Sequence, residues 1–97
     1  MTTAPELVDD LGITYRQLDY WERQGFIRAL PRTAQRSGHH REFTDTECRI
    51  ARDIRDLLDA GFTLAAAVEV TRRLRESPFE HTFDLAPGIT ITIDRPL

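Results

Sequence analysis

Residues 12–26 read GITYRQLDYWERQGF, and this stretch decides the fold. A threonine followed three residues later by a glutamine is typical of a capped helix N-terminus, and the second glycine favours a helix end. Between these signals, Leu18 and Trp21 have the spacing of a buried helical stripe. The stretch therefore predicts a short helix over about residues 15–24.

The opposite side of this helix is basic and aromatic. Arg16, Tyr20 and Arg23 recur there at i, i+4 and i+7. Arg16 opposes the positive end of the helix dipole at a cost of roughly 0.3–1 kcal/mol, which an anionic partner would remove. The major groove of DNA admits one helix, and Arg and Gln side chains read guanine and adenine edges. The pattern predicts a DNA-contacting helix, with a merely solubilising face as the alternative.

The same start signal recurs on both sides of this stretch. Residues 3–6 and 44–47 each pair a threonine with a glutamate three positions later, and glycines at positions 12 and 61 favour helix ends. Two short helices joined by a glycine turn form a helix-turn-helix. We expect four helices, over about residues 4–11, 15–24, 45–60 and 64–76.

A wing is predicted between the second and third helices. Ile27–Leu30 is typical of a short strand that a proline ends, and RTAQRSGHH is a polar loop. Residues 41–43 can return as the second strand of this pair. The fold class predicted is mainly α, a winged helix-turn-helix of four helices with a β-hairpin wing, followed by a short C-terminal β-hairpin or strand pair.

That C-terminal element is predicted from period-two alternation over residues 82–85 and 89–94, with a Pro-Gly turn between them. An isolated hairpin is unstable in water, so its apolar face must be covered. We favour a homodimer formed through these strands, and the alternative is a tail that folds back on its own chain. The expected division is a DNA-binding domain over residues 1–77 and a β-strand extension over residues 78–97.

Charge is unevenly distributed along the 97 residues. The net charge is −3, yet residues 14–44 carry six arginines against three acids. A local basic patch is what matters for a phosphate backbone. The N-terminus lacks the basic and apolar regions of a signal peptide, and no apolar run approaches the roughly 18 residues of a membrane span. We expect a cytoplasmic, nucleoid-associated protein that does not contact a membrane.

No residue pattern indicates catalysis. The sequence contains no glycine-rich phosphate loop and no nucleophile motif, so we expect neither an enzyme nor a cofactor. Cys48 is the one cysteine and is expected to be a small core residue. His39 and His40 are adjacent in sequence, so they cannot comfortably share one ion as i, i+4 histidines would, and no metal site is expected.

Four segments with matching spacing carry a resemblance to a known family. They are Leu18–Phe26 (LDYWERQGF), Arg41–Phe43 (REF), Thr44–Glu47 (TDTE) and Gly61–Leu64 (GFTL). Residues 3–76, about three quarters of the chain, resemble the N-terminal DNA-binding domain of MerR-type transcriptional regulators. The segment GITYRQLDYW is most similar to actinobacterial members. Many members have arginine at the position of Asp19.

The resemblance implies that the second helix enters the major groove and that the wing lies on the flanking phosphate backbone. Base reading is expected from Arg16 and Gln17, since N-terminal residues of a recognition helix point deepest. Tyr20, Arg23 and Arg41 are expected to position the protein. The full set of expected DNA-contacting residues is Thr14, Tyr15, Arg16, Gln17, Tyr20, Arg23, Arg36, Ser37, His39, His40 and Arg41.

The chain departs from the family pattern after its fourth helix. MerR-type regulators usually continue into a long dimerisation helix and an effector or metal-binding domain, whereas here Pro78 is expected to end the helix. We therefore expect a sequence-specific regulator without an effector domain and without a small-molecule effector. Two alternatives remain. One is an excisionase-like architectural DNA-binding protein, and the other is a protein-interaction module that uses the Tyr/Arg face.

Overall fold

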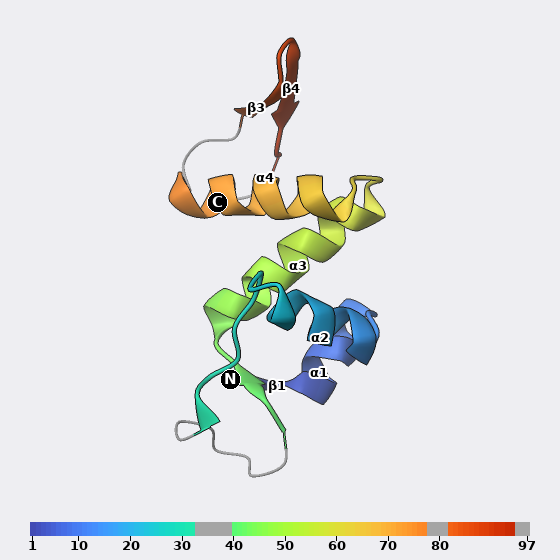
Figure 1. Cartoon of the computed structure of the whole chain (residues 1–97), viewed down its shortest axis with the longest axis vertical. Helices are drawn as coiled ribbons and strands as arrows, with labels where there is room; N and C mark the ends of the chain where they lie inside the picture. The colour runs from blue at the N-terminus through green and yellow to red at the C-terminus, as the bar shows by residue number, and fades with distance from the viewer. Residues whose placement is uncertain (33–39, 78–81, 95–97) are drawn as a thin grey trace.

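The computed structural model describes residues 1–32, 40–77 and 82–94 of the 97-residue chain. Its four helices are α1 (Ala4–Leu11), α2 (Tyr15–Arg23), α3 (Asp45–Asp59) and α4 (Leu64–Glu76). Its strands are β1 (Thr2–Thr3), β2 (Glu42–Phe43), β3 (Thr82–Ala86) and β4 (Ile89–Thr92). The molecule is elongated, with α1 and α2 near one end and the β3–β4 hairpin at the other (Figure 1). The mainly helical winged helix-turn-helix class is confirmed.

The turn between α1 and α2 is fixed by caps on both sides. Gly12 adopts φ 64°, a left-handed conformation that suits glycine, and its neighbour Ile13 donates its N–H to the Val8 carbonyl at 3.2 Å. Thr14 then begins α2 through a reciprocal capping box with Gln17. The two helices are therefore joined by a tight, hydrogen-bonded turn, as the sequence predicted.

The prediction of a wing strand at Ile27–Leu30 was wrong. These residues form no strand, although the Leu30 N–H donates to the Glu42 carbonyl at 2.8 Å. Instead β2 pairs antiparallel with β1, with Thr2 opposite Phe43 and Thr3 opposite Glu42. Pro31 follows directly, and proline disfavours a strand because its ring fixes φ and it has no N–H to donate. The wing therefore returns along the N-terminus of the chain, beside α1.

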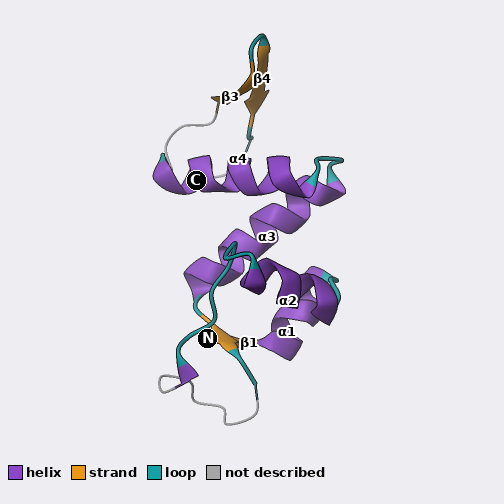
Figure 2. Ribbon diagram, viewed as in Figure 1, coloured by secondary structure: helices purple, strands orange, loops and turns teal. Residues whose placement is uncertain are grey.

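One hydrophobic core joins the helices. Leu18 and Trp21 of α2 are buried as predicted, and Phe43 of β2 and Ile54 of α3 lie in the same cluster. Thr44 and Thr63 cap α3 and α4 by accepting backbone N–H groups. Helix α3 runs obliquely from the α1–α2 end to α4, which lies across its far end (Figure 2).

The C-terminal strands form the expected hairpin. Phe83 pairs with Ile91 and Asp84 with Thr90, and Gly88 has the positive φ (81°) that the turn requires. Phe83 is buried in the core, and the Arg73 side chain of α4 donates to the Asp84 carbonyl. Part of the predicted apolar face is therefore covered by the same chain, while Ile89 stays 57% exposed. No helix among the described residues is long and apolar enough to cross a membrane.

Candidate nucleic-acid interface

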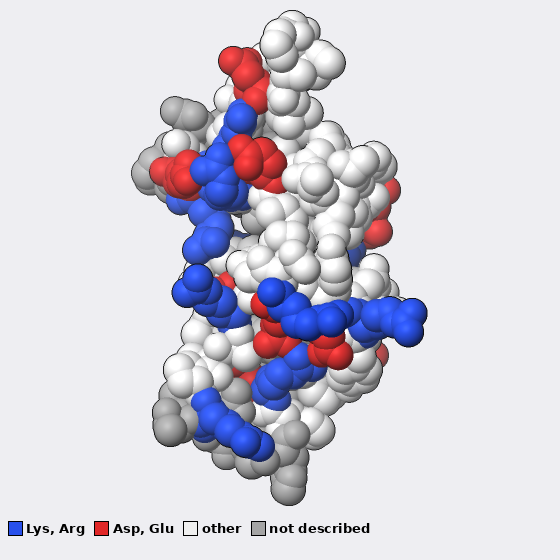
Figure 3. All heavy atoms as spheres, viewed as in Figure 1, with Lys and Arg blue, Asp and Glu red and all other residues white. Residues whose placement is uncertain are grey.

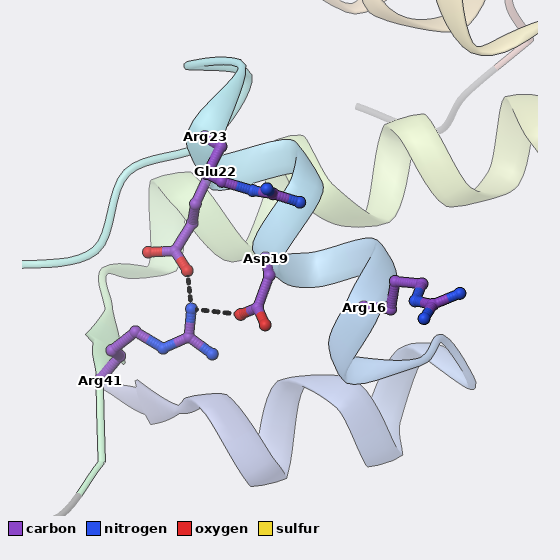
Figure 4. A pocket seen from close by; sticks show the side chains of 5 residues that line it. All are labelled: Arg16, Asp19, Glu22, Arg23 and Arg41. Atoms are coloured by element: carbon purple, nitrogen blue, oxygen red, sulfur yellow. Dashed lines mark hydrogen bonds and ion pairs between the residues drawn. The ribbon is translucent and has the colours of Figure 1, made fainter.

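The solvent side of α2 presents the predicted basic and aromatic residues. Tyr15 and Tyr20 are 50% and 42% exposed, and Arg16 and Arg23 are also exposed. Neither arginine forms an ion pair or hydrogen bond with another residue that the structure describes. In Figure 4, both guanidinium groups point away from the neighbouring carboxylates. They are therefore available to an anionic partner.

The first turn of α2 uses two of the predicted contact residues for capping. The Thr14 N–H donates to Gln17 Oε1 at 2.9 Å, and the Gln17 N–H donates to Thr14 Oγ1 at 3.1 Å. Reading adenine requires a Gln amide to donate and to accept at once. Because Gln17 Oε1 accepts from both the N–H and the Oγ1 of Thr14, at 2.9 Å and 3.4 Å, only its amide N–H₂ group remains for a base unless the cap opens. Opening a cap costs about 1 kcal/mol.

Arg41 holds the wing against α2. Its Nη1 lies 2.8 Å from Asp19 Oδ1 and also donates to Glu22 Oε2 (Figure 4). Arg41 was expected to bind phosphate, and in this structure its guanidinium is engaged by two carboxylates of α2. An open hollow of about 770 Å³ lies at this cluster. It is lined by Arg41, Asp19 and Glu22, together with Arg16 and Arg23.

Within this cluster, burial has its clearest electrostatic effect on Glu22. The Glu22 side chain is 18% exposed, and this burial raises the pKa of Glu22 above its ordinary value. The Arg41 guanidinium acts in the opposite direction and Asp19 adds to the rise. Two carboxylates share one guanidinium, so the cluster of Asp19, Glu22 and Arg41 has a net charge of −1. The other charged side chains of this face are cationic.

A second hollow lies on the other side of α2. It measures about 480 Å³, with Trp21, Leu58 and Leu64 as its apolar lining. The polar lining comes from α2 and consists of Arg16, Gln17, Tyr20 and Arg23. The exposed face of α2 therefore separates two hollows, one beside the wing and one beside the α3–α4 turn.

The predicted wing residues are only partly described. His40 is exposed next to Arg41, whereas Arg36, Ser37 and His39 lie outside the described residues. Sequence reasoning missed Asp19 and Glu22 as members of this face. Their spacing of three residues on one flank of α2 was the available signal, but the partner that joins them lies about 20 residues away, beyond the wing loop.

The view in Figure 3 shows arginine side chains spread over the end of the molecule that contains α1 and α2, with acidic side chains between them. Acidic and basic side chains alternate over α4, where Arg72 pairs with Glu69 and Glu76. Among the described residues, no group of three His, Cys, Asp or Glu side chains could hold a metal ion. Arg16 and Arg23 therefore give α2 an exposed basic side that makes no ion pair with another described residue.

Known proteins that are similar to this chain are helix-turn-helix regulators, in agreement with this fold. The model of the MerR HTH family regulatory protein matches residues 2–74. Uncharacterized HTH-type transcriptional regulators from Mycobacterium bovis and from two strains of Mycobacterium tuberculosis are 37% identical over 61 residues. The match covers 63% of this chain and 27% of each of these relatives. No solved structure matches.

Proposed function

The chain belongs to the MerR family of HTH regulatory proteins, and we propose that it regulates transcription by placing α2 in the major groove of double-stranded DNA. The observation that carries the proposal is that Arg16, Tyr20 and Arg23 project from one side of α2 without partners among the described residues. The site of action is the cytoplasm, at the nucleoid.

The residues of α2 divide into two roles. Arg16 lies in the first turn, where a recognition helix comes nearest to the base edges, so it reads a guanine. Tyr20 and Arg23 lie one and two turns further along and contact phosphate or sugar. In this arrangement Arg41 first anchors the wing to α2, and its remaining N–H groups, with His40, face the flanking backbone.

A selection from a random duplex library tests the proposal. We expect the 97-residue chain to retain a palindromic motif at about 0.1 M salt, and its affinity to fall steeply as salt rises because phosphate contacts release counterions. Retention without a motif, or with direct repeats only, would indicate the architectural alternative. Failure to retain any duplex at low salt would instead favour a protein partner for the Tyr/Arg face.

A homodimer through the C-terminal strands is the second part of the proposal. Helix α4 packs mainly against β3, so β4 is the outer strand of the hairpin. The sequence of β4, ITIT, has no charge, no proline and no bulge of its own to block pairing with another strand. Antiparallel pairing of β4 with its copy would place Ile beside Ile without any conflict of charge.

We expect Thr92→Lys to shift the chain from dimer to monomer in sedimentation velocity, because it places two like charges in the joined strands. Thr82→Lys is the matched control, since Thr82 is the exposed cross-strand partner of Thr92 on β3. It should leave the dimer intact. A wild-type chain that sediments as a monomer at micromolar concentration would contradict this part of the proposal.

A further inference from the structure

The basic face of α2 contains an acidic side chain that the proposed function does not explain. Asp19 follows Arg16 by three positions and precedes Arg23 by four, so it is a neighbour of both on the helix surface. Its side chain is 50% exposed and lines the same hollow as the two arginines. A carboxylate here repels phosphate, so it weakens binding to DNA of any sequence.

Arg41, which follows the wing loop, holds the Asp19 carboxylate in position through an ion pair. Arg41 Nη1 lies 2.8 Å from Asp19 Oδ1, and the same nitrogen donates to Glu22. In Figure 4, the second oxygen of Asp19 takes no part in this pair. Asp19 therefore presents one oxygen that is constrained by an ion pair and one that can accept a hydrogen bond from a ligand.

The ion pair also makes approach to DNA possible. An ionised carboxylate that lost its water without a partner would carry a large penalty. Arg41 compensates part of this charge, and a donor on the DNA would satisfy the free oxygen. The face is thus arranged to tolerate a carboxylate near the groove only where the DNA supplies an N–H group.

Only two groups in the major groove supply such a donor, the N4 amino group of cytosine and the N6 amino group of adenine. Adenine places its N7 acceptor beside its donor, and a carboxylate has no proton to offer N7. Cytosine presents its amino group without an acceptor of its own in the groove. The chemistry of a fixed carboxylate therefore favours cytosine.

We propose that Asp19, held by Arg41, determines specificity by accepting a hydrogen bond from cytosine N4 in the major groove. This inference rests on the proposed function. Asp19 lowers affinity for unrelated sequences through repulsion of phosphate and recovers affinity where a cytosine is correctly placed. It thus increases discrimination more than affinity.

The test compares the wild type with Asp19→Asn, Asp19→Ala and Glu22→Gln in the duplex selection. We expect one cytosine per half-site in the wild-type motif, and substitution of that base to lower wild-type affinity by about 5-fold or more. In Asp19→Ala this preference should disappear, and in Asp19→Asn, which has both an amide acceptor and an N–H₂ donor, it should shift toward adenine. The base read by Arg16 should stay in both variants. Both should bind random duplex more tightly than the wild type.

Glu22→Gln is the matched control, because Glu22 shares Arg41 with Asp19 but is mostly buried. It should keep the cytosine preference. Loss of the preference in all three variants would overturn the inference, since the effect would then come from displacement of Arg41. An unchanged motif in both Asp19 variants would overturn it while leaving the proposed function standing. A wild type that selects no motif would overturn both.

Discussion

Replacing Arg16 by alanine is expected to lower affinity for the selected duplex by about 5-fold to 150-fold, which corresponds to about 1–3 kcal/mol for one bidentate arginine–guanine contact. The loss should be concentrated at one base position, and affinity for random duplex should fall much less. Fluorescence anisotropy with the selected duplex and with single-base variants of it measures both effects.

The fold should not suffer from this substitution. Arg16 is exposed in the first turn of α2, so its removal breaks no ion pair or hydrogen bond with another described residue. It also removes a cation from the positive end of the helix dipole. The midpoint of thermal unfolding should therefore stay the same or rise slightly. A fall in affinity together with a fall in the midpoint would point to a structural effect.

Arg75→Ala is the matched control for this experiment. Arg75 is an exposed arginine in the last turn of α4, and it lines neither hollow beside α2. Its removal deletes the same charge and should change affinity for every duplex by no more than about 2-fold. An equal loss in Arg16→Ala and Arg75→Ala would show that bulk charge, and not base reading, controls binding.

The helical part of this fold was predictable because its signals are local. Threonine caps at positions 3, 14, 44 and 63 begin the four helices, and glycines lie at or just after the ends of the first three. Each signal acts within about one helical turn, so the sequence around it contains the whole cause. The C-terminal hairpin was predictable for the same reason, from alternation and a Pro-Gly turn.

The contacts of the wing were not predictable in this way. The pairing of β2 with Thr2–Thr3 joins segments about 40 residues apart, and a strand of two residues has no periodicity that could reveal it. The ion pairs of Arg41 span a loop, and spacing along the chain says nothing about which carboxylates it reaches. Arg41 was expected to face phosphate because the resemblance to MerR-type regulators places the wing on the DNA backbone.

Trp21→Ala is expected to have the largest effect on the fold. Trp21 is 2% exposed and packs in the same core as Phe43 and Ile54. Replacing a buried aromatic by alanine costs about 3–5 kcal/mol. In a domain of this size the midpoint of thermal unfolding should fall by more than about 12 °C, at roughly 4–8 °C per kcal/mol. Circular dichroism at 222 nm measures the change.

The adjacent residue provides the control that separates the two sides of α2. Tyr20 is 42% exposed, so Tyr20→Ala should cost less than about 1 kcal/mol of stability. It should nevertheless weaken DNA binding, because Tyr20 lies on the face that carries Arg16 and Arg23. Equal destabilisation by both variants would mean that α2 is rotated from the orientation described here, and the DNA-contacting face would then have to be reassigned. Opposite responses from two neighbouring aromatic residues would instead establish that one side of this helix holds the core together while the other is reserved for DNA.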